Sequence, residues 1–227
     1  MVKVFLRGLD AGKRSRLQDC SPRRFSFILA ILLAARVFAG EHPLTDSFSV
    51  PERDRSAAQA LAEKLAALSP RVRKEEASRL ADCAYATAVH LKRQYGVLWP
   101  PLFNNFLVNS RIKKRGLCFQ WSEDMLVRFD GLKLTTLEFH WGEANPGTWH
   151  ENNCVVITAK NQPFRSGIII DCWRNSGRLY WNTVAADYEP WVENKAYARF
   201  IRAKAAVHRH HHTQLSMETE VARTSSD

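Results

Sequence analysis

The apolar positions of this chain repeat with helical spacing in its first half. Residues 57–68 are rich in Ala and Leu, and residues 70–95 carry an apolar position every three or four residues. Ser69 and Pro70 stop the first segment and start the second, because Ser is a favoured N-cap and Pro a favoured first helical residue. A third helix is predicted to begin with a cysteine. Its apolar face is formed by Cys118, Trp121, Ser122, Met125, Leu126 and Phe129.

The second half of the chain reads as a row of short strands separated by turns. Residues 132–141 alternate between apolar and polar positions, and apolar runs follow at 152–159, 167–173 and 179–184. Residues 193–207 are predicted to form a terminal helix. Strands joined by short turns pair with antiparallel neighbours, so an α+β fold is predicted, with the N-terminal helices packed on an antiparallel sheet.

The charge of the chain is concentrated at its beginning. The net charge is +10, and residues 1–40 hold eight Lys or Arg against two Asp, which is +6 of that total. No basic stripe interleaved with aromatic residues is recognised after residue 40, so no nucleic-acid partner is predicted.

The basic start leads into an apolar run at residues 25–35, and Val37, Phe38 and Ala39 offer a cleavage site before Gly40 or Glu41. This pattern predicts a secretory signal in residues 1–40, and a start codon placed too early would account for its long basic part. An uncleaved membrane anchor at 25–35 is the alternative. Either way we expect an exported protein of the periplasm or cell envelope, which meets a membrane only through this segment.

Residues 41–56 are polar with two prolines and are predicted to be a linker, which leaves 57–207 as one α+β domain. Residues 208–227 are predicted to be a disordered tail. The tail lacks an ordered carboxylate or Cys partner, so no metal site is predicted there. Dinucleotide, P-loop and zinc-protease motifs do not occur, and no cofactor is predicted. The histidines of the tail are His208, His210, His211 and His212.

The cysteines supply the candidate chemistry. Cys118 follows the turn at Gly116 and lies in the first turn of a predicted helix, where free N–H groups and the helix dipole favour a thiolate. The alternative is that Cys118 is simply a buried packing residue. Cys154 and Cys172 fall on consecutive predicted strands and could pair, although no sequence rule requires it.

Downstream of Cys118 the predicted strands carry His140, His150 and Asp171 in that order. A G-x-C pattern at a helix start, followed by strands bearing His and then Asp, resembles the transglutaminase-like branch of the papain-type cysteine enzymes. The resemblance covers roughly residues 100–185 and is strongest to the bacterial members. It implies an amide-cleaving or amide-transferring thiol enzyme that forms an acyl-enzyme on Cys118, with a protein or cell-wall peptide as substrate.

In such an enzyme a histidine takes the thiol proton and later gives it to the leaving amine, while a carboxylate orients the imidazole. The resemblance gives the carboxylate role to Asp171; a structural ion pair, for example with Arg174, is the alternative. An oxyanion needs a second donor besides the Cys118 N–H. The candidates for that donor are Gln120, Trp121 and Asn104.

The base position is occupied by an amide in this chain. Counted back from the apolar run of the second strand, the position of the catalytic histidine falls on Asn152. His150 lies two residues earlier, about 7 Å away along an extended chain, and a bulge or register shift would bring it in. Three possibilities stay open: His150 is the base, His140 is the base, or Asn152 marks a catalytically inactive relative with a binding or structural role.

Overall fold

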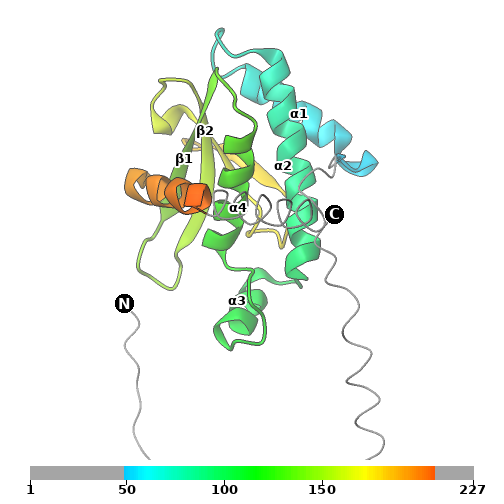
Figure 1. Ribbon diagram of the computed structural model, residues 1–227, viewed down its shortest axis with the longest axis vertical. Coiled ribbons are helices and arrows are strands. Elements are labelled where there is room, and N and C mark those ends of the chain that lie inside the picture. The colour runs from blue at the N-terminus through cyan, green and yellow to red at the C-terminus, as the bar shows by residue number, and fades with distance from the viewer. Residues whose placement is uncertain (1–48, 208–227) are drawn as a thin grey trace, which may run out of the picture. The chain divides into compact units, whose positions relative to one another are not determined.

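A computed structural model describes residues 49–207 of the chain. Within this range the predicted α+β fold is confirmed, with helices in the first half packed against an antiparallel sheet from the second (Figure 1). A further helix spans 195–207. The other helices are the 3-10 turns η1 (Glu52–Asp54) and η2 (Phe164–Ser166) and the α-helices α1 (Arg55–Ala66), α2 (Lys74–Tyr95), α3 (Pro101–Asn109) and α4 (Cys118–Gly131).

The sheet has five strands in the order β4-β3-β2-β1-β5, and every neighbouring pair is antiparallel. β2 lies at its centre: Val155 pairs with Trp141 of β1 on one side and with Ile170 of β3 on the other. The strands are β1 (Leu137–Ala144), β2 (Asn152–Ala159), β3 (Ile168–Asp171), β4 (Tyr180–Thr183) and β5 (Val192–Glu193).

β2 is buried along its whole length because both faces of the sheet are covered. Val155 and Ile157 face the large core cluster, which includes α1, α2 and α4. Cys154 and Val156, which point the other way as alternate residues of a strand must, belong to a smaller cluster with Phe164. In Figure 1, α4 lies between α2 and the β1–β2 hairpin. Cys118 at the start of α4 is hydrogen-bonded to Asn153 at the start of β2.

Several boundaries differ from those that the pattern predicts. The strand predicted at 132–141 begins only at Leu137, because the preceding Thr135 and Thr136 bind the carboxylate of Glu76 instead of extending the ladder. The linker predicted at 41–56 is helical from Glu52 onwards. Helix α3 and the short edge strand β5 were not predicted.

The signal or anchor predicted at 1–40 and the tail predicted at 208–227 lie outside the described residues. Among residues 49–207, none of the helices combines the length and apolar composition that crossing a bilayer requires.

Two glycines give a matched test of packing around the sheet. A Cβ on Gly167 would come within 2.5 Å of Val156 Cγ1 and 2.8 Å of the Ile157 carbonyl oxygen, whereas a Cβ on Gly131 would meet nothing within 4 Å. We expect Gly167→Ala to lower the free energy of unfolding by about 1–3 kcal/mol through overpacking. Gly131→Ala, at the end of α4, should be neutral or stabilising by up to ~1 kcal/mol. Urea denaturation measures both, and equal effects would contradict this account.

Candidate functional site

Cys118 is the first residue of α4, as predicted. The turn that leads into it is fixed by Gly116, which adopts φ +138°. The Gln120 side-chain oxygen accepts hydrogen bonds from the N–H groups of Gly116 and Leu117, at 2.7 and 3.1 Å. The Gln120 side chain, in the first turn of α4, therefore caps the start of the helix. Cys118 lies at this start, where α4 meets β2.

The Cys118 thiol is buried, with 8% of the residue exposed, and it contacts Asn153 at the start of β2 and Glu151 in the loop just before that strand. Asn153 Nδ2 donates to Sγ at 3.5 Å, and Sγ donates to the Glu151 carbonyl oxygen at 3.6 Å. Burial raises the pKa of the thiol above its ordinary value, and the Asn153 amide and the Phe119 N–H lower it by less. The helix start thus favours the thiolate as expected, but burial outweighs it.

The orientation of Asn153 is set by the residues around it. Trp141 Nε1 donates to Asn153 Oδ1 at 3.0 Å, which leaves the NH2 group to face the sulfur and Glu151 Oε1. The Ser122 hydroxyl contacts the Asn153 carbonyl oxygen at 2.9 Å. Asn153 was not among the predicted site residues. The alternation of β2 could have found it, because Asn153 shares the α4-facing side with Val155 and Ile157.

Asn152 and Asp171 are brought together on the opposite side of β2 from Asn153. Asn152 Nδ2 donates to Asp171 Oδ2 at 3.0 Å, and both side chains are almost fully buried. Asp171 also makes an ion pair with Arg174 Nε at 3.2 Å, as the structural alternative for this residue predicted. Burial raises the pKa of the Asp171 carboxyl, and Arg174 and Asn152 offset part of that rise.

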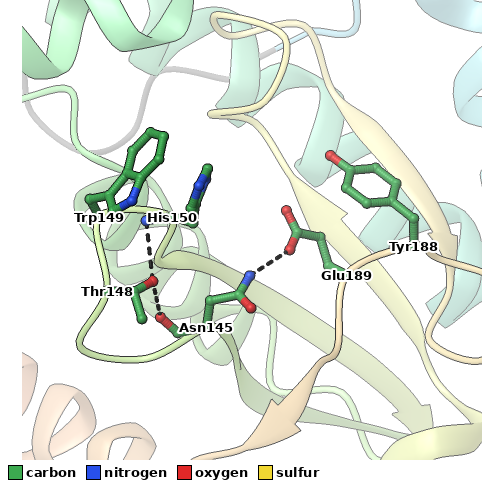
Figure 2. Close-up of a pocket in the computed structure, with 6 residues that line it drawn as sticks. All are labelled: Asn145, Thr148, Trp149, His150, Tyr188 and Glu189. Atoms are coloured by element: carbon green, nitrogen blue, oxygen red, sulfur yellow. Dashed lines mark hydrogen bonds between the residues drawn. The ribbon is translucent and has the colours of Figure 1, made fainter.

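His150 lies in the exposed loop between β1 and β2. Its backbone N–H donates to Thr148 Oγ1, and its ring lies against Trp149, with 3.4 Å between ring centroids. Figure 2 shows that it lines an open pocket of about 520 Å³. The Cys118 thiol is not part of this pocket. Its lining residues are Asn145, Thr148, Trp149, His150, Tyr188 and Glu189.

His140 lies on the face of the sheet that points away from α4. Nδ1 is 2.7 Å from Glu193 Oε1, Nε2 is 2.9 Å from Thr158 Oγ1, and the ring packs edge-on against Phe164. Trp141, the next residue, faces the α4 side with Asn153. The sheet therefore separates the His140 imidazole from the Cys118 thiol.

The three side chains predicted as oxyanion donors all have other partners. Gln120 caps the start of α4, and Trp121 Nε1 donates to the Gly116 carbonyl oxygen at 3.2 Å. Asn104 hydrogen-bonds both the N–H and the carbonyl oxygen of Leu98. Their polar groups stabilise the turns around residues 98–117, which is a structural use.

The cysteines on the sheet do not pair. Cys154 and Cys172 are both buried free thiols, and they belong to the clusters on opposite faces of the sheet. Between residues 49 and 207, no group of three or more His, Cys, Asp or Glu side chains is arranged to hold a metal ion.

Comparisons of the chain with known protein families, with curated proteins and with solved structures found no match.

Proposed function

We propose that this protein is a transglutaminase-like domain of the papain type that has lost catalysis and serves a binding or structural role in the cell envelope. One observation carries the proposal. The side chain that hydrogen-bonds the Cys118 thiol is the Asn153 amide, and the side-chain amide on Asp171 is that of Asn152. The order of Cys118 at a helix start followed by antiparallel strands ending in Asp171 supports the family assignment.

An amide cannot replace imidazole in this chemistry. A thiol attacks a carbonyl efficiently only after a base has taken its proton, and the same proton must later reach the leaving amine. Asn153 donates to sulfur and has no basic nitrogen at neutral pH. Because burial also raises the pKa of the thiol, Cys118 remains protonated and acts as a hydrogen-bonded link between α4 and β2.

The pocket lined by His150 gives the binding role a location. Trp149 and Tyr188 are 81% and 75% exposed, so two large rings are available to a ligand. In Figure 2 the Glu189 carboxylate is directed to the space between His150 and Tyr188. Asn145 Nδ2 donates a hydrogen bond of 3.1 Å to Glu189 Oε2. In this pocket Trp149 and Tyr188 would supply aromatic contacts, and the polar groups of Asn145, Thr148, His150 and Glu189 would orient a ligand.

The test is the pH dependence of iodoacetamide alkylation, followed for each cysteine peptide by mass spectrometry on the full chain. We expect the midpoint at Cys118 to lie above the free-thiol value of about 8.5 and to be unchanged in His150→Ala. Cys83, which is only half-buried, is the internal reference for reagent access. A midpoint below about 7 that is lost in His150→Ala would replace this proposal with the enzyme below.

The second candidate is an exported thiol enzyme that uses His150 as its base. The Glu151 carbonyl oxygen contacts the thiol at 3.6 Å, so the loop that carries His150 already reaches the site. If the loop turned the imidazole inward, it would take the thiol proton, and the thiolate would attack a peptide carbonyl. The amine would leave with that proton, and water or another amine would then release the acyl group from sulfur.

A further inference from the structure

Helix α3 is folded with its polar side inward. Asn104, in the middle of the helix, is 1% exposed. Its side-chain oxygen accepts a hydrogen bond from the Leu98 N–H, and its NH2 group donates to the Leu98 carbonyl oxygen. Asn105 accepts a hydrogen bond from Trp173 Nε1 at 3.0 Å. Amphipathic helices of soluble domains normally bury their apolar side instead. Asn105 thus attaches α3 to Trp173, and Asn104 attaches it to the turn before the helix, whereas Leu102, Phe103 and Phe106 are exposed.

The large apolar residues of α3 and its flanking turns are exposed together. Phe103 and Phe106 stack on each other, with 6.4 Å between ring centroids, and are 42% and 60% exposed. Figure 1 shows α3 at the lower end of the ribbon, away from the sheet and from α1. Exposed large apolar side chains that gather on one helix and its flanking turns indicate an interaction site. We define the α3 face as Leu98, Trp99, Leu102, Phe103, Phe106 and Ile112.

The charged residues of the segment that carries the α3 face have one sign. Residues 97–117 contain no Asp or Glu, and four basic residues follow the helix directly. Arg111 and Lys114 are exposed, whereas Lys113 binds the Gly96 carbonyl oxygen and Arg115 pairs with Asp124. Two exposed cations therefore lie next to a surface of Trp, Phe, Leu and Ile. This combination is typical of segments that lie in the interface of an anionic membrane.

We propose that the α3 face docks on an anionic phospholipid surface, with its aromatic and aliphatic side chains in the headgroup boundary and Arg111 and Lys114 against lipid phosphates. Charge complementarity selects this occupant. Trp99 is 72% exposed, and indole rings are enriched at membrane–water boundaries. The docking requires no property of Cys118, so it stands apart from the proposed function. It also differs from the membrane contact expected of residues 25–35.

The experiment uses residues 47–227, which include all the described residues and both core clusters, so that residues 25–35 do not contribute to binding. Co-sedimentation is measured with vesicles of phosphatidylcholine with and without phosphatidylglycerol. We expect binding only to the anionic vesicles, and a loss of at least about tenfold in partitioning for Phe103→Ser with Phe106→Ser. Arg111→Gln and Lys114→Gln should each weaken binding about fivefold, an effect that salt reduces.

The matched control lies on the terminal helix. Phe200 is 57% exposed, a value similar to the 60% of Phe106, and its sequence neighbour Arg199 is exposed as well. Phe200→Ser with Arg199→Gln should leave vesicle binding unchanged, and circular dichroism checks that all variants are folded. The proposal is overturned if the unit ignores anionic vesicles, or if the control weakens binding as much as the α3 variants do. Self-association that the α3 variants abolish, without vesicle binding, would assign the face to a second copy of the chain.

Discussion

Arg174→Met is expected to lower the free energy of unfolding by about 3–5 kcal/mol, since it leaves buried carboxylates without their cation. The guanidinium is 3.2 Å from Asp171 and 3.0 Å from Asp187, and both carboxylate side chains are fully buried. It also lies over the rings of Tyr180 and Tyr188, at 4.4 and 4.7 Å from their centroids. Chemical denaturation at neutral pH measures the loss.

The control for Arg174 is a second arginine that binds both oxygens of one carboxylate. Arg202 binds both oxygens of Asp130 at 2.8 and 3.2 Å, but the two side chains are 38% and 28% exposed. Arg202→Met should therefore cost no more than about 1 kcal/mol. In the Arg174→Met background, Asp171→Asn should be stabilising, because it removes an uncompensated buried charge. Equal losses at the two arginines would show that burial does not govern these pairs.

The pH dependence of Arg174→Met follows from the same pairing. Burial would raise the pKa of Asp187, but hydrogen bonds from Arg174, Glu189 N–H and Trp191 hold it below the ordinary value. Its contribution in the wild type is therefore present at neutral pH and lost on acidification. Without Arg174 both carboxyls should have raised pKa values, so protonation favours the folded variant. The difference in the free energy of unfolding between the wild type and Arg174→Met should narrow as the pH falls from 7 towards about 4.

Glu76→Gln is expected to cost about 3 kcal/mol at neutral pH, because a buried carboxylate bound by charge-assisted hydrogen bonds loses an acceptor oxygen. Glu76 lies in the first turn of α2 and is 2% exposed. It accepts the N–H and hydroxyl groups of Thr135 and Thr136 and pairs with Arg73. The Gln NH2 group would face some of these donors, and the join between α2 and the segment before β1 would weaken.

The contribution of Glu76 to stability depends on pH, and acid denaturation measures the direction of that dependence. Burial alone would raise the pKa of Glu76, but the bonds from Arg73, Thr136 and Thr135 hold it well below the ordinary value of 4.5. The Glu76 carboxylate therefore binds a proton more readily in the unfolded chain than in the folded one. Its contribution to stability is complete above pH 4.5 and is lost as the pH falls below that value. The wild type should lose stability more steeply than Glu76→Gln in that range. The neighbouring exposed residue supplies the control, since Glu75→Gln should change stability by less than about 0.5 kcal/mol.

These two clusters support the strands that carry the residues beside the thiol. Arg174 keeps Asp171 in place for Asn152, and Glu76 ties α2 to the segment that leads into β1, where Trp141 orients Asn153. A loss at either position should therefore change access to Cys118 as well as stability. The alkylation rate at Cys118 in Arg174→Met reports this coupling.

The sequence by itself determined the elements that periodicity governs. The stripe of α2 from Ala77 to Tyr95 is buried as predicted, and Gly96 ends that helix with φ +54°. β2 has the predicted bounds of Asn152–Ala159. The start of α4 at Cys118 is also confirmed. These segments are set by local spacing and by turn residues, which act within a few positions of the chain.

The tertiary structure alone decided which side chains surround the thiol. That Asn153 faces the sulfur, while Asn152 bonds Asp171, depends on how α4 lies across β2. That α3 exposes Phe103 and Phe106 depends on two asparagines finding partners at Leu98 and Trp173. The contacts of Asn152, Asn153 and Asn105 join residues far apart in the sequence, so they depend on packing and on the pairing of buried polar groups. Local periodicity assigns Asn152 and Asn153 to opposite faces of β2, but it does not say which partner each face meets.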